Sequence, residues 1–477
     1  MMIRFGRVLA VAAAFGLTAC AGGASSGGSR PTPATSASGG QMLQQGQRPR
    51  QNDDTRAAER ALSQAEGTEA EAEAQALYQQ ALTSAQAAIA ADSTNPLPQL
   101  QAGRATMGLG RWQEADAYLD RAEALRPLYS LEIQPMRERA WINLYQEAAP
   151  LVNEGDYEGA AVVFEKANAI YDQRPEVMIT LGQIYAQLRR HDEALANLTR
   201  AEAIIHDSAR VAEMDSATVA SWRELGAEIP LTKAQVLADA GRFEEAVGIF
   251  ESLVQANPSD ITLKRNLAAI LIQIGDTTRA FDVYQELLAL PGLSNQDYYA
   301  IGVGYYQGAD YGRAAQAFKG AADRSKNDRD AIEMWTRSLQ IDSAYSEVPA
   351  AAERWLALDP SNQNGLLILA QAVNQLGDEA RASDLVRQIE ALPVSIADLQ
   401  MLRRDDGARV TGSAMNKTLA PGTVITLGFT FYDAAGNTLG TQAVTVTLGQ
   451  QGMSEPFDLM YTSTQKVEGY SYTVMGT

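Results

Sequence analysis

Few side chains in this sequence could carry out chemistry. The 477-residue chain contains one cysteine, Cys20, and two histidines, His191 and His206. A single thiol excludes an intramolecular disulfide, and one cysteine with two scattered histidines argues against a zinc site. The one Gly-x-Ser-x-Gly string, Gly23-Ala24-Ser25-Ser26-Gly27, lies in the polar segment after Cys20, and the sequence has no phosphate-binding Gly-Lys loop and no His-Glu-x-x-His. We therefore expect no enzyme activity, no cofactor and no bound metal. The one reactive group of interest is the thiol near the N-terminus.

The residues around Cys20 suggest what that thiol is for. Arg4 and Arg7 precede the apolar, small residues 8–17, an arrangement typical of a secretory signal. This run is too short to span a bilayer as a mature helix. The string Leu17-Thr18-Ala19-Cys20 resembles the bacterial lipobox, in which a peptidase cuts before the cysteine and the thiol receives diacylglycerol. The alternative is an ordinary signal with an incidental cysteine.

The lipobox resemblance implies export by a signal peptide and attachment to a membrane by lipid. Residues 1–19 would be a lipoprotein signal peptide, and acyl chains on Cys20 would hold the protein in a membrane at about 0.8 kcal/mol per buried CH₂. Ala21 is not the aspartate that retains many lipoproteins at the inner membrane, which favours the outer membrane, facing the periplasm. Residues 20–56 are polar and rich in Gly, Ser and Pro, so we expect the lipidated cysteine to be followed by a disordered tether.

Most of the remaining chain repeats at a constant interval. A glycine is followed five residues later by an alanine at Gly241–Ala246, Gly275–Ala280 and Gly377–Ala382, and Ala314 and Val348 continue the same spacing. These markers are 34 residues apart. A fixed period of 34 residues predicts a solenoid in which each unit packs on its neighbours. The glycine suits the left-handed turn between two helices, and the small alanine lets them approach closely.

The same marker continues towards the N-terminus at Ala81, Ala115, Ala160 and Ala194. Two gaps, from Ala115 to Ala160 and from Ala194 to Ala246, exceed the common interval and indicate insertions near 128–139 and 206–226 as lengthened helices or loops. We predict a mostly α chain with about nine units over residues 57–396, closed by a capping helix at 397–404. A solenoid needs some cover over its last apolar face.

The repeat resembles the tetratricopeptide repeat, which places Leu-Gly and then Tyr on its first helix and Ala, Phe, Ala and Pro on its second. The matching residues are Leu181, Gly182, Tyr185, Ala194 and Ala201 in one unit, and Gly302, Tyr305, Ala314, Phe318 and Ala321 in another. The unit of Val348 departs most, because it lacks the glycine and carries Trp335 and Trp355.

The resemblance implies a concave groove that is lined by the first helices and binds an extended peptide or a helix. The family's groove positions fall on Gln183, Gln235, Arg265, Tyr299, Tyr306 and Gln371. Tyrosine and arginine are good binding anchors because they combine area with a directed polar tip. The alternative for each is an ordinary place on a solvated face.

The pattern changes to period two near the C-terminus. Ile425, Leu427, Phe429 and Phe431 alternate with polar or small residues, which predicts strands, and residues 405–477 are expected to form a small antiparallel β-sandwich. The stretch 429–436 resembles the bacterial FxLYD domain, with Phe431 in place of the usual leucine. That resemblance implies an immunoglobulin-like fold.

These features favour two functions. The net charge of −19 argues against nucleic acid as a partner. The first hypothesis is a membrane-anchored, non-catalytic scaffold of the bacterial cell envelope, which binds a protein partner in the groove during assembly of an envelope complex. The alternative is a lipoprotein that binds a glycan or solute through the β module, which would need Tyr461, Tyr470 and Tyr472 exposed on one sheet face.

Overall fold

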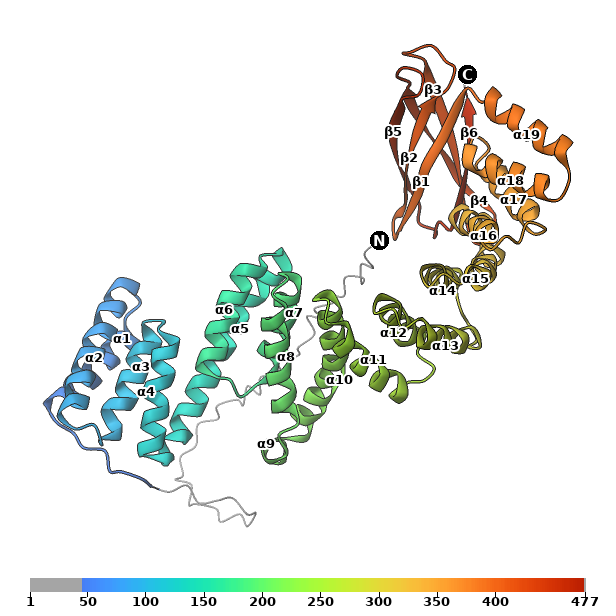
Figure 1. Ribbon diagram of the computed structural model, residues 1–477. Coiled ribbons are helices and arrows are strands. Elements are labelled where there is room, and N and C mark those ends of the chain that lie inside the picture. Colours follow the sequence, from blue (N-terminus) through green and yellow to red (C-terminus); the bar gives the residue numbers. More distant parts are fainter. Residues whose placement is uncertain (1–44, 476–477) are drawn as a thin grey trace. The chain divides into compact units, whose positions relative to one another are not determined.

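The computed structural model describes residues 45–475, with the backbone alone at Glu213. The predicted signal peptide, the lipobox with Cys20 and much of the predicted tether lie outside the described residues. The described chain contains nineteen α-helices followed by six β-strands (Figure 1). It divides into two compact units, with the boundary between Gly241 and Arg242. The predicted fold class, a helical solenoid followed by a small antiparallel β module, is confirmed.

The first unit is entirely helical over its described residues. Its helices are α1 (Asp53–Gly67), α2 (Glu71–Ala91), α3 (Pro96–Gly108), α4 (Trp112–Leu125), the 3-10 turn η1 (Pro127–Tyr129), α5 (Ser130–Glu154), α6 (Tyr157–Ile170), α7 (Pro175–Gln187), α8 (His191–Ile205), α9 (Ser208–Glu213) and α10 (Ser216–Asp239). The residues predicted as insertions fall in η1 and the first turns of α5, and in α9 and the first half of α10. Both lengthen a first helix of a pair.

The second unit continues the helix pairs and ends in strands. Its helices are α11 (Phe243–Ala256), α12 (Ile261–Gln273), α13 (Thr277–Leu288), α14 (Asn295–Gln307), α15 (Tyr311–Arg324), α16 (Arg329–Ile341), α17 (Val348–Leu358), α18 (Gln363–Gln375) and α19 (Glu379–Ala391). The first helices α12, α14, α16 and α18 each have 13 residues, and their starting positions are evenly spaced along the chain.

The joint between the two helices of a pair has the same backbone in eight successive pairs. In each, the residue five before the alanine or valine marker has a positive φ; these residues are Gly110, Gly155, Arg189, Gly241, Gly275, Ala309, Ser343 and Gly377. The three pairs without a glycine at this position therefore keep the joint, because Arg189, Ala309 and Ser343 adopt the left-handed conformation themselves (φ 59–62°). The first pair differs, since its break at residues 68–70 lies much further before its marker, Ala81.

Close packing explains the small residues on both helices. A Cβ on Gly302 of α14 would lie 2.7 Å from the ring of Phe318 on α15, so only glycine leaves room for that aromatic. The markers Ala246, Ala280 and Ala314 are completely buried.

The folded region begins earlier than predicted, so the tether boundary at residue 56 is wrong. Asn52 caps α1 by accepting a hydrogen bond from the Thr55 amide, 2.8 Å away. The amide of Gln47 donates to the Leu125 carbonyl at 2.8 Å, and the backbone of Arg50 exchanges hydrogen bonds with the Asn95 side chain. Residues 45–52 are held through backbone groups, which a polar composition does not reveal.

The strands form two three-stranded antiparallel sheets. The strands are β1 (Val394–Arg404), β2 (Gly407–Asn416), β3 (Val424–Tyr432), β4 (Thr438–Thr447), β5 (Ser454–Thr462) and β6 (Gly469–Met475). One sheet has the order β1-β2-β5 and the other β4-β3-β6. The predicted alternation in β3 is confirmed, because Ile425, Leu427, Phe429 and Phe431 are all completely buried in the core between the sheets.

The predicted capping helix at 397–404 is wrong, because these residues belong to strand β1. Val394, Ile396, Leu399 and Met401 point into the sandwich core. A bulge between Ala397 and Gln400, with Asp398 at φ 54°, shifts the alternation by one residue and hides the period of two. The solenoid helices end at Ala391 and the sandwich begins at Val394, not at 405.

The sandwich joins the last repeats through a buried polar network rather than a linker. Asp359, at the end of α17, is fully buried and accepts hydrogen bonds from Arg329 of α16 and from the Tyr472 hydroxyl of β6, each at 2.7 Å. The Arg403 guanidinium of β1 lies 2.8 Å from Asp328. Backbone bonds add to these contacts, since the Tyr470 amide donates to the Asn327 carbonyl at 3.1 Å.

Candidate functional site

The six predicted groove residues all lie on first helices. Gln183 is on α7, Gln235 on α10, Arg265 on α12, Tyr299 and Tyr306 on α14, and Gln371 on α18. Gln371 is exposed and the other five are half-buried.

Two of these residues bridge neighbouring first helices. Arg265 Nη1 lies 2.9 Å from Asp297 Oδ1 and so links α12 to α14. Gln371 Oε1 accepts a hydrogen bond of 2.8 Å from Gln340 and so links α18 to α16. Adjacent first helices of the second unit therefore present a shared polar face, although contact with a partner stays a prediction.

The two tyrosines of α14 pack against their own repeat. The Tyr299 ring meets Phe318 edge-on, with ring centroids 5.3 Å apart, and burial raises the pKa of its hydroxyl. The Tyr306 ring meets Tyr311 edge-on at 5.2 Å. Both have a structural role, and Tyr299 in particular has little surface left for a ligand.

The tyrosines that the alternative function would need on one exposed face of the β module are not exposed together. Tyr470 and Tyr472 are buried and face the helices, where Tyr472 donates to Asp359. Tyr461 is half-buried and stacks on Phe431 with a centroid distance of 4.2 Å. These three tyrosines therefore do not form the exposed aromatic cluster that the alternative function would need. These side chains instead form the core of the sandwich and its junction with the repeats.

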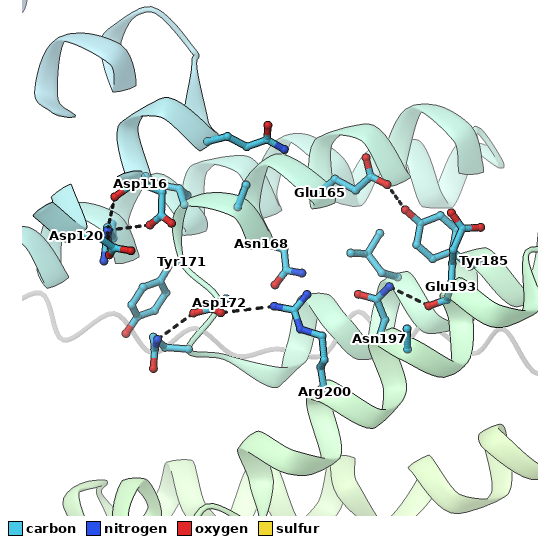
Figure 2. Close-up of a pocket in the computed structure, with 17 residues that line it drawn as sticks. Asp116, Asp120, Glu165, Asn168, Tyr171, Asp172, Tyr185, Glu193, Asn197 and Arg200 are labelled. Carbon is cyan, nitrogen blue, oxygen red and sulfur yellow. Dashed lines mark hydrogen bonds and ion pairs between the residues drawn. The ribbon is translucent and has the colours of Figure 1, made fainter. Parts of the chain in front are cut away.

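A pocket that the sequence analysis missed lies in the first unit, mainly among the second helices α4, α6 and α8 (Figure 2). Its volume is about 700 Å³, and one side chain from α5 and two from α7 complete its wall. The labelled residues are mostly polar; the charged ones that line it are Asp116, Asp120, Arg137, Glu165, Asp172, Glu193 and Arg200. None of the predicted groove residues lines this pocket.

Arg137 organises one wall of the pocket. It is 6% exposed, and its Nη2 lies 2.8 Å from both Asp116 Oδ1 and Asp120 Oδ1. Glu123 is a third carboxylate, 3.9 Å from Nη1. The Nε–H of Arg137 has no hydrogen-bond acceptor among the described residues. One buried cation thus faces three carboxylates and keeps a free donor.

Asp116 is the titratable group of this wall with a clearly changed pKa. Burial raises the pKa of its carboxyl to about 6, and the neighbouring charges of Asp120, Asp172 and Glu123 act in the same direction. The Arg137 guanidinium lowers the pKa but does not outweigh the other effects.

The opposite wall is built from α6, α7 and α8. The Tyr185 hydroxyl donates a short hydrogen bond to Glu165, and burial raises the pKa of this phenol. Arg200 of α8 lies 3.5 Å from Asp172, in the connection between α6 and α7 (Figure 2). Asn168 is placed between the two walls, and its buried Oδ1 accepts no hydrogen bond from the described residues.

The sequence carried a signal for this pocket. Asp120 and Glu165 both stand five residues after their alanine markers, so successive second helices present a carboxylate at the same position. Only the structure shows that α4 and α6 lie close enough for these carboxylates to share one pocket.

No group of three or more His, Cys, Asp or Glu side chains in residues 45–475 is arranged to hold a metal ion. Within the same residues, no helix is both long enough and apolar enough to cross a membrane.

Comparisons with known proteins identify the repeats. Two family models, each described as a tetratricopeptide repeat, match residues 151–214 and 231–296. A search of curated proteins finds no match. Among solved structures, the C-terminal part of a TPR repeat-containing protein from Cytophaga hutchinsonii is similar, with 15% identity and a TM-score of 0.40, covering 52% of this chain and 95% of that chain.

Two further solved structures are similar at the same level. YrrB, described as a TPR protein with an unusual peptide-binding site, has 16% identity and a TM-score of 0.29, covering 38% of this chain and 84% of its own. A tetratricopeptide repeat protein from Parabacteroides merdae has 17% identity and a TM-score of 0.28, covering 60% of this chain and 99% of its own. From the two family matches, we conclude that this chain contains tetratricopeptide repeats, at least over residues 151–214 and 231–296.

Proposed function

We propose that this protein is a membrane-anchored, non-catalytic scaffold of the bacterial cell envelope that binds a protein partner through its repeats. The observation that carries the proposal is the presence of tetratricopeptide repeats, which generally serve protein–protein interaction. Each repeat contacts only its neighbours, so an array of them presents an extended surface without a central active site.

The first-helix face supports this proposal. In the second unit, the Arg265–Asp297 and Gln340–Gln371 contacts align polar side chains of adjacent repeats along one surface. Directed polar groups of this kind can read an extended peptide or a helix laid across several repeats. An extended partner would gain affinity from many small contacts rather than from one deep site.

The anchor is the second part of the proposal. It rests on the lipobox string that ends at Cys20 and on Ala21 after it, which together favour lipidation and the periplasmic side of the outer membrane. The polar residues between Cys20 and the segment at 45–52 would let the repeats stand away from the lipid surface.

The C-terminal sandwich, whose sequence resembles the FxLYD domain, would act as a cap for the repeats. Its contacts with the last repeats include the Tyr472–Asp359 hydrogen bond, beside the buried Arg329–Asp359 pair, and the Arg403–Asp328 pair. A module held this firmly is suited to closing the helical stack and to fixing its last repeats.

Site-specific photo-crosslinking in native envelopes tests the scaffold function. A photoreactive residue at Gln371, on the first-helix face, should give a discrete covalent adduct with a protein partner. The matched control is Lys319, which is exposed on the second helix α15 of the same unit. Mass spectrometry identifies the adducts. Equal adducts from both positions, or none from Gln371, would contradict binding through the first helices.

Labelling with a fatty acid tests the anchor separately. Wild-type protein should incorporate the label and fractionate with membranes, whereas Cys20→Ala should do neither. Unchanged labelling of the Cys20→Ala protein would refute lipid attachment at this thiol.

A further inference from the structure

We propose that the pocket among α4, α6 and α8 binds a lysine or arginine side chain of a protein partner together with the peptide carbonyl beside it. This inference rests on the proposed function, because it specifies the chemistry of a protein partner. It also goes further, since it places a second contact surface on the second helices, away from the groove predicted on the first helices.

The charge of the pocket favours a cation. Five carboxylates line it against two guanidinium groups, a formal balance of three negative charges. The two guanidinium groups are already engaged, Arg137 with Asp116 and Asp120 and Arg200 with Asp172. A cationic side chain in the pocket would relieve repulsion among carboxylates held on three neighbouring helices.

Two unsatisfied polar atoms indicate that the occupant is more than a bare cation. Arg137 is over nine-tenths buried and its Nε–H lacks an acceptor, and the buried Oδ1 of Asn168 lacks a donor. Buried polar groups are normally paired, so each points to a missing partner. Both atoms are covered in the unbound structure, so a basic residue of a polypeptide would pair them after a small side-chain rearrangement, with its carbonyl accepting from Nε and its cationic N–H groups donating to Oδ1.

The wall opposite Arg137 is prepared for such a contact. The hydroxyl of Tyr185 holds the Glu165 carboxylate by a short hydrogen bond, and the Arg190 guanidinium lies 4.3 Å from the centre of the Tyr185 ring. Glu165 is therefore oriented before the ligand arrives, which lowers the entropy lost on binding. The volume of about 700 Å³ fits within the range of about 300–1,000 Å³ typical of ligand sites.

The raised pKa of Asp116 supports the geometric argument. A carboxyl with a pKa of about 6, facing Arg137 from α5, Asp120 and Glu123 from α4 and Asp172 from the α6–α7 connection, loses its proton more readily beside a bound cation. Peptide affinity should therefore fall when the pH is lowered from 7.5 to 5.

The test uses the full chain and blocked pentapeptides, acetyl-Gly-Gly-X-Gly-Gly-amide with X as arginine, lysine or glutamine, measured by titration calorimetry and saturation-transfer NMR. The arginine and lysine peptides should bind at least tenfold more tightly than the glutamine peptide. Glu165→Gln should weaken arginine-peptide binding about tenfold. The matched control Glu158→Gln removes an exposed carboxylate from the same helix, outside the pocket, and should leave the affinity unchanged.

A second variant and a competitor complete the test. Asp116→Asn should weaken binding at pH 7.5 and remove most of the loss seen at pH 5. 1,4-Diaminobutane, which lacks a carbonyl, should compete at least tenfold less well than the lysine peptide. Equal binding of all three peptides, or equal effects of Glu165→Gln and Glu158→Gln, would overturn the proposal. Equal competition by the diamine would overturn the assignment to a polypeptide.

The outcome is separable from that of the proposed function. Failure of the pentapeptides together with a discrete adduct at Gln371 would remove the pocket as a contact and leave the scaffold intact. Peptide binding at the pocket without any adduct at Gln371 would support the pocket and contradict binding through the first-helix face.

Discussion

Replacing Asp359 by alanine should loosen the junction between the last repeats and the sandwich. Asp359 is fully buried, and its Oδ2 accepts hydrogen bonds from Arg329, Asn362 and Trp355 at 2.7–3.3 Å. Its Oδ1 accepts from the Tyr472 hydroxyl at 2.7 Å. One carboxylate therefore connects α16, α17, the turn before α18, and β6.

The expected loss of stability follows from the buried charge that Asp359→Ala leaves without this partner. The Arg329 guanidinium is also buried and would keep Asp330 and Glu333 as partners but lose both of its hydrogen bonds to Asp359. Breaking a buried ion pair by removing one partner typically costs about 3–5 kcal/mol, because the other charge stays desolvated. Asp359→Asn should cost nearly as much, since an amide nitrogen cannot accept the donors that converge on Oδ2.

Hydrogen exchange of the full-length protein measures this effect locally. A loss of about 3–5 kcal/mol corresponds to a fall in protection of roughly a hundredfold to a few thousandfold in α18 and β6, at about tenfold per 1.4 kcal/mol. Amides of α3 and α4 in the first unit provide an internal reference that should not change. Fluorescence of Trp355, which is completely buried beside Asp359, provides a second readout.

The control is Glu353→Ala on the same helix α17. Glu353 is half exposed and pairs with Arg381 at the surface, and such pairs contribute about 0–1 kcal/mol. If Asp359→Ala costs no more than Glu353→Ala, the network does not hold the sandwich on the repeats, and the view of the sandwich as an integrated cap fails.

Three further predictions concern the repeats and their junction. Ala280→Leu should lower the free energy of unfolding by about 1–3 kcal/mol, because Ala280 is completely buried between helices; a thermal denaturation curve identical to wild type would contradict the packing. Gly275→Ala should cost about 1 kcal/mol at a joint with φ 80°, whereas Ala309→Gly, at the equivalent joint with φ 62°, should stabilise by a similar amount; urea denaturation giving the same sign for both would refute the argument. Burial raises the pKa of Asp328 to about 6 despite the nearby Arg403, so the folded state keeps a proton that the unfolded state releases near pH 4. The free energy of unfolding should therefore fall by up to about 3 kcal/mol as the pH rises from 4 to 6. Urea titrations at each pH measure this change, and Asp328→Asn should remove it.

The sequence alone was sufficient for the repeat register. Helix pairing within a repeat depends on contacts between residues close in the chain, so a small residue at a fixed interval and a turn residue five before it mark each pair. The residue at the joint between the two helices has a positive φ in all eight pairs. This includes Arg189, Ala309 and Ser343, where the sequence has no glycine to indicate it. The alternation of apolar and polar residues likewise identified β3, because one face of that strand is buried in the sandwich core and the other is not.

The two wrong predictions, the capping helix at 397–404 and the end of the tether at residue 56, have a common cause. Both segments are held by contacts with residues that lie far from them in the sequence. Residues 397–404 were predicted as helix because the bulge at Asp398 interrupts the alternation of β1, and only pairing with β2 makes the strand evident. The segment at 45–52 is held by Leu125 and Asn95, which lie far from it in the chain.

The sequence by itself determined the repeated unit, the change to strands and the lipobox that would anchor the chain, since each is written in neighbouring residues. Only the tertiary structure decided that Tyr470 and Tyr472 are buried against the helices, and that carboxylates from α4, α6 and α8 share a pocket with Arg137. Those arrangements depend on how the repeats stack. Stacking is set by packing between repeats, and the period of the sequence does not specify it.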